Sequence, residues 1–126
     1  MERKTITIEN ITDEVSVKVR NILGDKLRKI ILYGSYARGN YNEESDIDVM
    51  VLADVSNEKE LQELEKAVWN IGWDVGFEYD IMVSVFLKDN NHFNEWRDSM
   101  AYYQNITNDG VVLYEASNNT YCLGRT

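Results

Sequence analysis

The chain has 126 residues, of which 44% are hydrophobic and 28% are charged, and these values are typical of one soluble globular domain. No segment approaches the roughly 20 apolar residues of a membrane span, and the N-terminus has no apolar signal-peptide core, so we expect a cytoplasmic protein without a membrane partner. The net charge is −9 and the 13 Lys and Arg residues are scattered, which argues against a long nucleic-acid substrate because such proteins normally present a basic face.

The first half of the chain predicts a helix followed by two strands. Apolar residues at helical spacing predict the helix over residues 12–23, with Thr12 as a plausible N-cap. The apolar run 27–33 predicts a strand, and 34–40 reads as a tight connector. Residues 46–53 predict a second strand.

The second helix is expected to open at the capping pair Asn57 and Glu60. An apolar stripe at helical spacing follows, and the glycines at 72 and 76 are expected to close the helix. Residues 78–87 then predict a third strand, because apolar residues dominate this run.

On that third strand Asp80 shares one face with the residues at 82 and 84. A further helical pattern covers 93–103, a short strand is expected at 111–114, and the tail 117–126 reads as loosely ordered. The resulting order predicts an α/β fold in which a mixed sheet of about four strands is flanked by helices.

The stretch from Gly34 to Asp48 carries the chemistry. Gly34 lets the backbone approach a ligand closely, and Ser35 can N-cap a short helix whose N-terminus suits a phosphate. Asp46 and Asp48 are two apart on a strand and therefore share a face. Two adjacent carboxylates repel one another, and Mg²⁺ resolves this because it prefers oxygen ligands. Two such ions could bridge the carboxylates and nucleotide phosphates.

A third acid is expected from the next strand. If that strand neighbours the second one in register, Asp80 completes a triad with Asp46 and Asp48. Asp80 could then hold the second metal or take the proton from the incoming nucleophile. Glu78 lies on the same face and stays open as the alternative, although the apolar residues directly after Asp80 favour Asp80.

This pattern resembles the DNA polymerase β-like nucleotidyltransferase superfamily. The matching residues are Gly34-Ser35, ten intervening residues, Asp46-Ile47-Asp48, and Asp80 in an apolar strand, with Arg38-Gly39 and Ser45 at the usual flanks. The length and the absence of a helical extension resemble the minimal (MNT) branch, which includes the antitoxins of HEPN–MNT toxin–antitoxin pairs. The resemblance covers about residues 12–115 and implies one domain over 1–126.

The resemblance implies that a hydroxyl attacks the α-phosphate of ATP and that pyrophosphate leaves. It implies two Mg²⁺ ions on Asp46, Asp48 and Asp80. Nucleotide contacts are expected from Gly34, Ser35, Arg38 and Ser45, with Gly34 and Ser35 at the β- and γ-phosphates. In MNT antitoxins the acceptor is a tyrosine of the partner HEPN ribonuclease, so a HEPN-domain toxin is the expected partner. Nucleotidylation of a small molecule such as an aminoglycoside, and a binding module that only occludes a toxin, stay as alternatives.

Some residues favour simpler roles. Arg38 could bind phosphate, but pairing with an acid to hold the loop is favoured, and Ser45 reads as a turn hydrogen-bonder. His92 is the only histidine and reads as a surface residue, and with Cys122 as the only cysteine no zinc set exists. Five aromatic residues late in the chain are expected to be mostly core, with some able to dock a partner: Trp69, Trp73, Trp96, Tyr102 and Tyr103.

Overall fold

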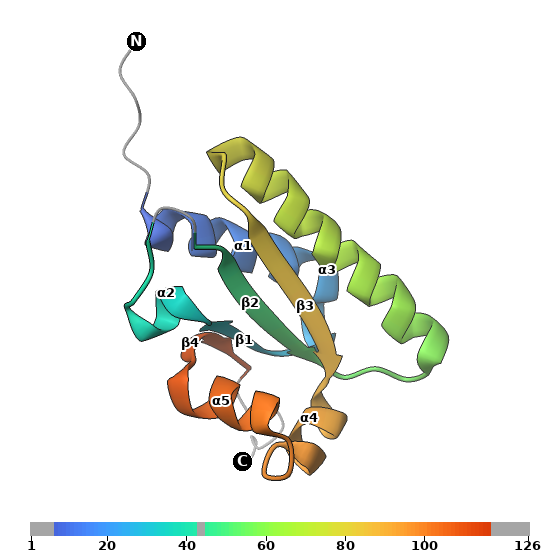
Figure 1. Ribbon diagram of the computed structural model, residues 1–126. Coiled ribbons are helices and arrows are strands. Elements are labelled where there is room, and N and C mark those ends of the chain that lie inside the picture. Colours follow the sequence, from blue (N-terminus) through green and yellow to red (C-terminus); the bar gives the residue numbers. More distant parts are fainter. Residues whose placement is uncertain (1–6, 43–44, 117–126) are drawn as a thin grey trace.

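The computed structural model describes residues 7–42 and 45–116 (Figure 1). The tail 117–126, including Cys122, lies outside the described residues. In the part of the chain that is described, no helix combines the length and apolarity needed to cross a bilayer. The elements in chain order are α1 (Ile8–Leu23), the 3₁₀ turn η1 (Gly24–Lys26), β1 (Leu27–Tyr33), α2 (Ser35–Arg38), β2 (Ile47–Ala53), α3 (Glu58–Tyr79), β3 (Val83–Asp89), α4 (Asn90–Trp96), α5 (Ala101–Asp109) and β4 (Val111–Glu115).

The strands form one mixed sheet in the order β3-β2-β1-β4. Strand β1 pairs antiparallel with both β2 and β4, whereas β2 and β3 run parallel. A parallel pair needs a long crossover between its strands, and helix α3 supplies it (Figure 1). The expected α/β fold with a four-stranded mixed sheet flanked by helices is therefore confirmed.

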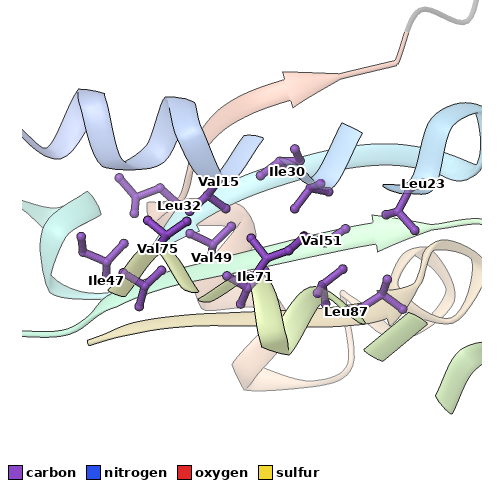
Figure 2. Close-up of a cluster of buried hydrophobic side chains, with 14 of the residues drawn as sticks. Val15, Leu23, Ile30, Leu32, Ile47, Val49, Val51, Ile71, Val75 and Leu87 are labelled. Carbon is purple, nitrogen blue, oxygen red and sulfur yellow. The ribbon is translucent and has the colours of Figure 1, made fainter. Parts of the chain in front are cut away.

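One face of the sheet is covered by α1 and α3 and holds the larger apolar core. Val15 of α1 lies in one cluster with Val49 and Val51 of β2 (Figure 2). Val19 of α1 belongs to the same cluster, and all four side chains are fully buried. Burying a side chain of this kind is worth about 1.5–3 kcal/mol. This core fixes β2 at the centre of the fold, between β1 and β3.

Helices α4 and α5 lie on the opposite face of the sheet (Figure 1). Their buried residues Phe93, Tyr103 and Ile106 cluster with Met50 of β2 and its neighbours. Alternate residues of a strand share a face, so Asp48 lies on this second face, one step beyond Met50. The helical pattern expected over 93–103 is divided between the two helices.

Helix α1 begins four residues earlier than expected. Its N-cap is Thr7, whose hydroxyl accepts a hydrogen bond from the N–H of Asn10 at 3.0 Å. Thr12 is not a cap: it is buried, and its hydroxyl donates to the carbonyl of Ile8 at 2.9 Å. The extra turn is stabilised because Ile11 packs into the core, at 2% exposure.

The expected start of α3 is confirmed, because Asn57 Oδ1 accepts from the N–H of Glu60 at 2.9 Å. Its expected end at the two glycines is wrong, since the helix continues to Tyr79. A Cβ at Gly72 would overlap the carbonyl oxygen of Val83, and one at Gly76 would meet the carbonyl of the chain just before β3. The glycines therefore let α3 pack closely on the sheet edge, and this tertiary contact outweighs their low helix propensity.

The longer helix displaces the third strand. Asp80 is the C-cap of α3 with φ of 58°, and β3 begins at Val83. The strand expected over 78–87 is therefore wrong for residues 78–82. Asp80 is therefore not a strand residue, and the alternation of strand faces cannot place it beside the second strand.

Candidate functional site

Gly34 connects β1 to the short helix α2 and adopts a conformation that favours glycine, with φ of 79° and ψ of −158°. Its carbonyl accepts hydrogen bonds from the N–H groups of Ala37 and Arg38, both at 3.1 Å. A Cβ at position 34 would lie 2.6 Å from Oδ2 of Asp48. Glycine is therefore required at position 34 for two reasons: the backbone has a positive φ, and a side chain would overlap the carboxylate of Asp48.

Helix α2 has only one turn. Ser35 is its first residue and Gly34 is the N-cap, which corrects the expectation that Ser35 caps the helix. No side chain caps this N-terminus. Gly39 ends the helix in a left-handed conformation, and its N–H donates to the carbonyl of Ser35 at 2.9 Å. The N-terminus of this turn lies next to Asp48, because its N-cap Gly34 is close to that carboxylate, and a helix N-terminus suits a phosphate.

Asp46 and Asp48 stand on either side of the buried Ile47, at the start of β2. Asp46 is exposed and Asp48 is partly buried. Asp48 is the Cα partner of Tyr33 on β1 and of Ser84 on β3. The expected pairing of the two carboxylates at one strand end thus exists next to Gly34.

Burial and two neighbouring charges act on the carboxylate of Asp48. Burial raises the pKa of Asp48, repulsion by Asp46 raises it further, and the guanidinium of Arg38 lowers it. Arg38 is exposed at the end of α2 and is near enough to Asp48 to act on its charge. The carboxylates thus repel each other while one is partly desolvated, and a cation between them would remove the penalty.

These donors fit magnesium. Protein sites for Mg²⁺ often supply one or two carboxylates and complete the shell with waters and substrate phosphates. Asp46 and Asp48 supply the carboxylates, and the uncapped start of α2 beside them suits the phosphates. Within residues 7–42 and 45–116, no three acidic, histidine or cysteine side chains form a cluster that could hold a metal.

The structure does not bring Asp80 to this pair. Asp80 is exposed at the end of α3, and the residue of β3 that pairs with Asp48 is Ser84. Glu78, the alternative third acid, lies in the last turn of α3 with an exposed side chain. Sequence reasoning missed Ser84 because the start of β3 was placed five residues too early.

Ser45 has the turn role that the sequence favoured. Its hydroxyl accepts from the N–H of Asn42 at 2.9 Å, and its own N–H donates to the carbonyl of Asn42 at 3.1 Å. This closure orients the chain that enters β2 at Asp46. His92 is exposed, as expected, and its Nδ1 lies 3.3 Å from the hydroxyl of Tyr103.

Two tyrosines, Tyr33 beside Asp48 and its neighbour Tyr102, were not assigned to the site by sequence reasoning. Tyr33 precedes Gly34 and pairs across the strands with Asp48. Its hydroxyl lies 3.0 Å from the hydroxyl of Tyr102 on α5, and the two rings meet edge to face. Burial raises the pKa of Tyr33, followed by its hydrogen bond to Tyr102. The position of Tyr33 next to the Gly-Ser pair is the signal that could have identified it.

Comparison with known proteins begins with a family model. The model described as nucleotidyltransferase domain matches residues 16–103. A Methanocaldococcus jannaschii protein, provisionally named a protein adenylyltransferase, is 32% identical over 89 residues, which cover 71% of this chain and 80% of the relative. A second protein of that organism with the same provisional name is 43% identical over 77 residues, covering 61% of this chain and 75% of the relative.

Solved structures share the fold at low identity. A chain of a crystal structure described as a toxin–antitoxin with AMP-PNP aligns at a TM-score of 0.52 and 23% identity, covering 91% of this chain and 79% of that one. A Shewanella oneidensis structure, described as a tri-AMPylated HEPN toxin with its MNT antitoxin, aligns at 0.52 and 19% identity, covering 90% and 78%. The family match covers both Gly34 and Asp48, and the resemblance seen in the sequence is confirmed. This chain belongs to the nucleotidyltransferase domain family.

Proposed function

We propose that this chain is a magnesium-dependent protein adenylyltransferase that transfers AMP from ATP to a tyrosine of a partner HEPN-domain toxin. The observation that carries the proposal is the contact of Gly34 with Asp48, which joins the expected phosphate loop to the paired carboxylates. The provisional name of the M. jannaschii relatives supports protein as the acceptor. The toxin–antitoxin complexes among the structural neighbours support a HEPN partner.

In this proposal the N–H groups at the start of α2 and the hydroxyl of Ser35 hold the β- and γ-phosphates. Asp46 and Asp48 would hold magnesium, which when bound would neutralise phosphate charge and stabilise the attacking and leaving oxygens. Arg38, whose charge acts on Asp48, would be available to the phosphates if the carboxylates held magnesium. The two ions that the family resemblance implies would therefore share two protein carboxylates, without help from Asp80.

The reaction forms one bond and breaks one. The acceptor oxygen attacks the α-phosphorus, the bond between that phosphorus and the bridging oxygen of the β-phosphate breaks, and pyrophosphate leaves with the electron pair. The proton of the hydroxyl passes to solvent or to a carboxylate of the pair. Tyr33 and Tyr102 bound the space beside Asp48, where the nucleotide or the acceptor would lie.

Intact-mass spectrometry tests the proposal. The chain is mixed with ATP, Mg²⁺ and the protein encoded by the adjacent gene, and Asp48→Asn is the matched inactive variant. We expect the adjacent protein to gain one or more AMP units with the wild type and none with the variant. Gain of the same mass with Asp48→Asn would refute the site assignment.

A second function is a binding module that neutralises its partner by occlusion. The observation that favours it is the row of exposed aromatic side chains on α3, formed by Trp69, Trp73 and Phe77. It predicts that the two proteins co-elute without any mass gain and that Asp48→Asn inhibits the partner as well as the wild type does.

A further inference from the structure

Helix α3 has one face against the core and a second face of exposed aromatic side chains. Trp69, Trp73 and Phe77 recur every four residues and therefore lie in one row along the helix. They are 38%, 59% and 89% exposed, in that order. Four of the five late aromatics expected to be mostly core are exposed, and Tyr103 alone of those five is buried. We call Trp69, Trp73 and Phe77 the α3 stripe.

A hollow of about 280 Å³ runs beside the α3 stripe. Its floor is formed where Gly72 and Gly76 let α3 approach the start of β3, and Met82, 52% exposed, lines it. Side chains larger than hydrogen at the two glycine positions would overlap the neighbouring backbone. The hollow is thus built into the packing of helix on strand, and its lining is mainly apolar.

The α3 stripe continues around the sheet edge toward the candidate active site. Strand β3 is an edge strand, and its Phe86 contacts Trp69, with ring centroids 5.5 Å apart. Phe86 shares a strand face with Ser84, the Cα partner of Asp48. The carbonyl of Met82 also accepts from the N–H of Ile47, between the two site acids, at 2.9 Å. A protein that covers both Trp69 and Phe86 would therefore extend onto the face of the sheet that carries Asp48.

Charge indicates which protein fits. The charged residues near Trp73 and Phe77 are Asp74, Glu78 and Asp80, and the sequence from 67 to 87 contains no Lys, Arg or His. At the other end of the stripe, Lys66, Lys88 and Glu65 line the surface beside Trp69, so the acidic border belongs to the Trp73 and Phe77 end. The whole chain carries −9. A second copy would bring acid against acid, which costs free energy. A partner with apolar side chains flanked by Lys and Arg would match both the aromatic row and its acidic border.

We propose that the α3 stripe is the docking surface for the acceptor protein, which presents apolar side chains flanked by Lys and Arg. This inference rests on the proposed function, because it names the surface that would bring the acceptor hydroxyl to the nucleotide. Trp73 and Phe77 supply the contact area, as exposed aromatic residues commonly do at interface centres. The nearby acids favour encounter with a basic surface.

Binding and transfer are measured separately to test this. The adjacent-gene protein is titrated calorimetrically into Asp48→Asn and into the same variant carrying Trp73→Ala and Phe77→Ala. We expect the double substitution to weaken binding at least about tenfold. The matched control is Trp96→Ala, which removes an indole of 45% exposure from α4 on the other side of the sheet, and it should leave binding unchanged. Equal binding of the stripe and control variants would overturn the proposal, as would a lack of binding by the parent protein.

Two further measurements identify which protein binds the α3 stripe. Asp74→Lys should weaken binding and reduce its salt dependence, because the acidic border is lost. In the active background, the stripe variant should raise KM for the acceptor protein and leave the KM for ATP unchanged. A dimer of the wild type that the stripe variant dissociates, seen by sedimentation, would assign the surface to a second copy and refute this proposal. Stripe-dependent binding without AMP transfer would refute the proposed reaction alone.

Discussion

Gly34 and Asp48 are in contact, so the loop after β1 and the start of β2 form one unit: a Cβ at position 34 would lie 2.6 Å from Oδ2 of Asp48. The two residues belong to the two halves of the motif recognised in the sequence. Their contact explains why the site needs both the Gly-Ser turn and the Asp-x-Asp strand. Gly34 is the N-cap of α2, and its lack of a side chain also leaves room for the carboxylate of Asp48.

Substitution of Gly34 by alanine should therefore slow AMP transfer by moving Asp48. Gly39→Ala is the matched control, since Gly39 has a similar φ of 83° and no heavy atom within 4 Å of an added Cβ. Each substitution should cost about 1–3 kcal/mol of unfolding free energy from backbone strain. Only Gly34→Ala should also lower the AMP-transfer rate at equal folded fraction, by about 10²-fold, because displacement of about 1 Å can cost that much. Urea unfolding and intact-mass kinetics give the two quantities, and equal rates for the two variants would contradict this account.

The charge of Asp48 should lower the stability of the metal-free protein at neutral pH. Burial and Asp46 raise the pKa of Asp48 in the folded state above the ordinary value of 3.8. The folded protein therefore binds the proton more tightly than the unfolded chain, and stability falls as pH rises from 3.8 through the folded-state pKa. Asp48→Asn removes this penalty and should raise the unfolding free energy at pH values around 7, but not at the acidic end of that window.

The control for that experiment is Asp54→Asn. Asp54 accepts a hydrogen bond from Arg28 Nε at 2.7 Å, so its neutralisation removes a favourable pair and should cost roughly 0.2–1 kcal/mol. Opposite signs for the two variants in urea titrations at neutral pH are expected. A loss of stability for both would show that attraction by Arg38 outweighs burial and the repulsion by Asp46, and that Asp48 is stabilised as an anion.

Magnesium should stabilise the wild type through the same carboxylates. A ligand that binds only the folded state at about 100 times its Kd adds roughly 2.7 kcal/mol to the unfolding free energy. We expect Mg²⁺ to raise the melting temperature of the wild type, more strongly with a non-hydrolysable ATP analogue present. Asp48→Asn should lose most of this increase while Asp54→Asn keeps it. An undiminished increase in Asp48→Asn would place the ion elsewhere.

The parts of this site that could be read from sequence are those fixed by short-range rules. Gly34 and Ser35 follow directly from a strand, and Asp46 and Asp48 share a face by the alternation of strand residues. The start of α3 at Asn57 is likewise a local capping pattern. Each depends on neighbours in the chain, so no knowledge of the packing was needed.

The expected position of Asp80 on a strand beside the second one is wrong, because it depended on packing that the sequence does not show. Two glycines in α3 were interpreted as a helix end, whereas they permit close contact between the helix and the start of β3. That contact extends the helix to Tyr79 and shifts the strand start to Val83. Similarly, the exposed side chains of Trp69 and Trp73 could not be separated from core residues, because helical spacing is the same on either face of α3.

The difference between Asp80 and Ser84 leads to a final prediction. Asp80→Asn should keep transfer within about twofold, because asparagine also tolerates the left-handed C-cap and Asp80 lies outside the carboxylate pair. Ser84→Asp instead places a third carboxylate opposite Asp48 on the neighbouring strand, where the sequence led us to expect a third acid. It should lower the stability of the metal-free protein by repulsion and increase its affinity for Mg²⁺ in calorimetric titration. If Asp80→Asn abolished transfer without a change in melting temperature, residues 78–82 would have to rearrange during catalysis and bring Asp80 to the nucleotide, and the two-carboxylate site would be wrong.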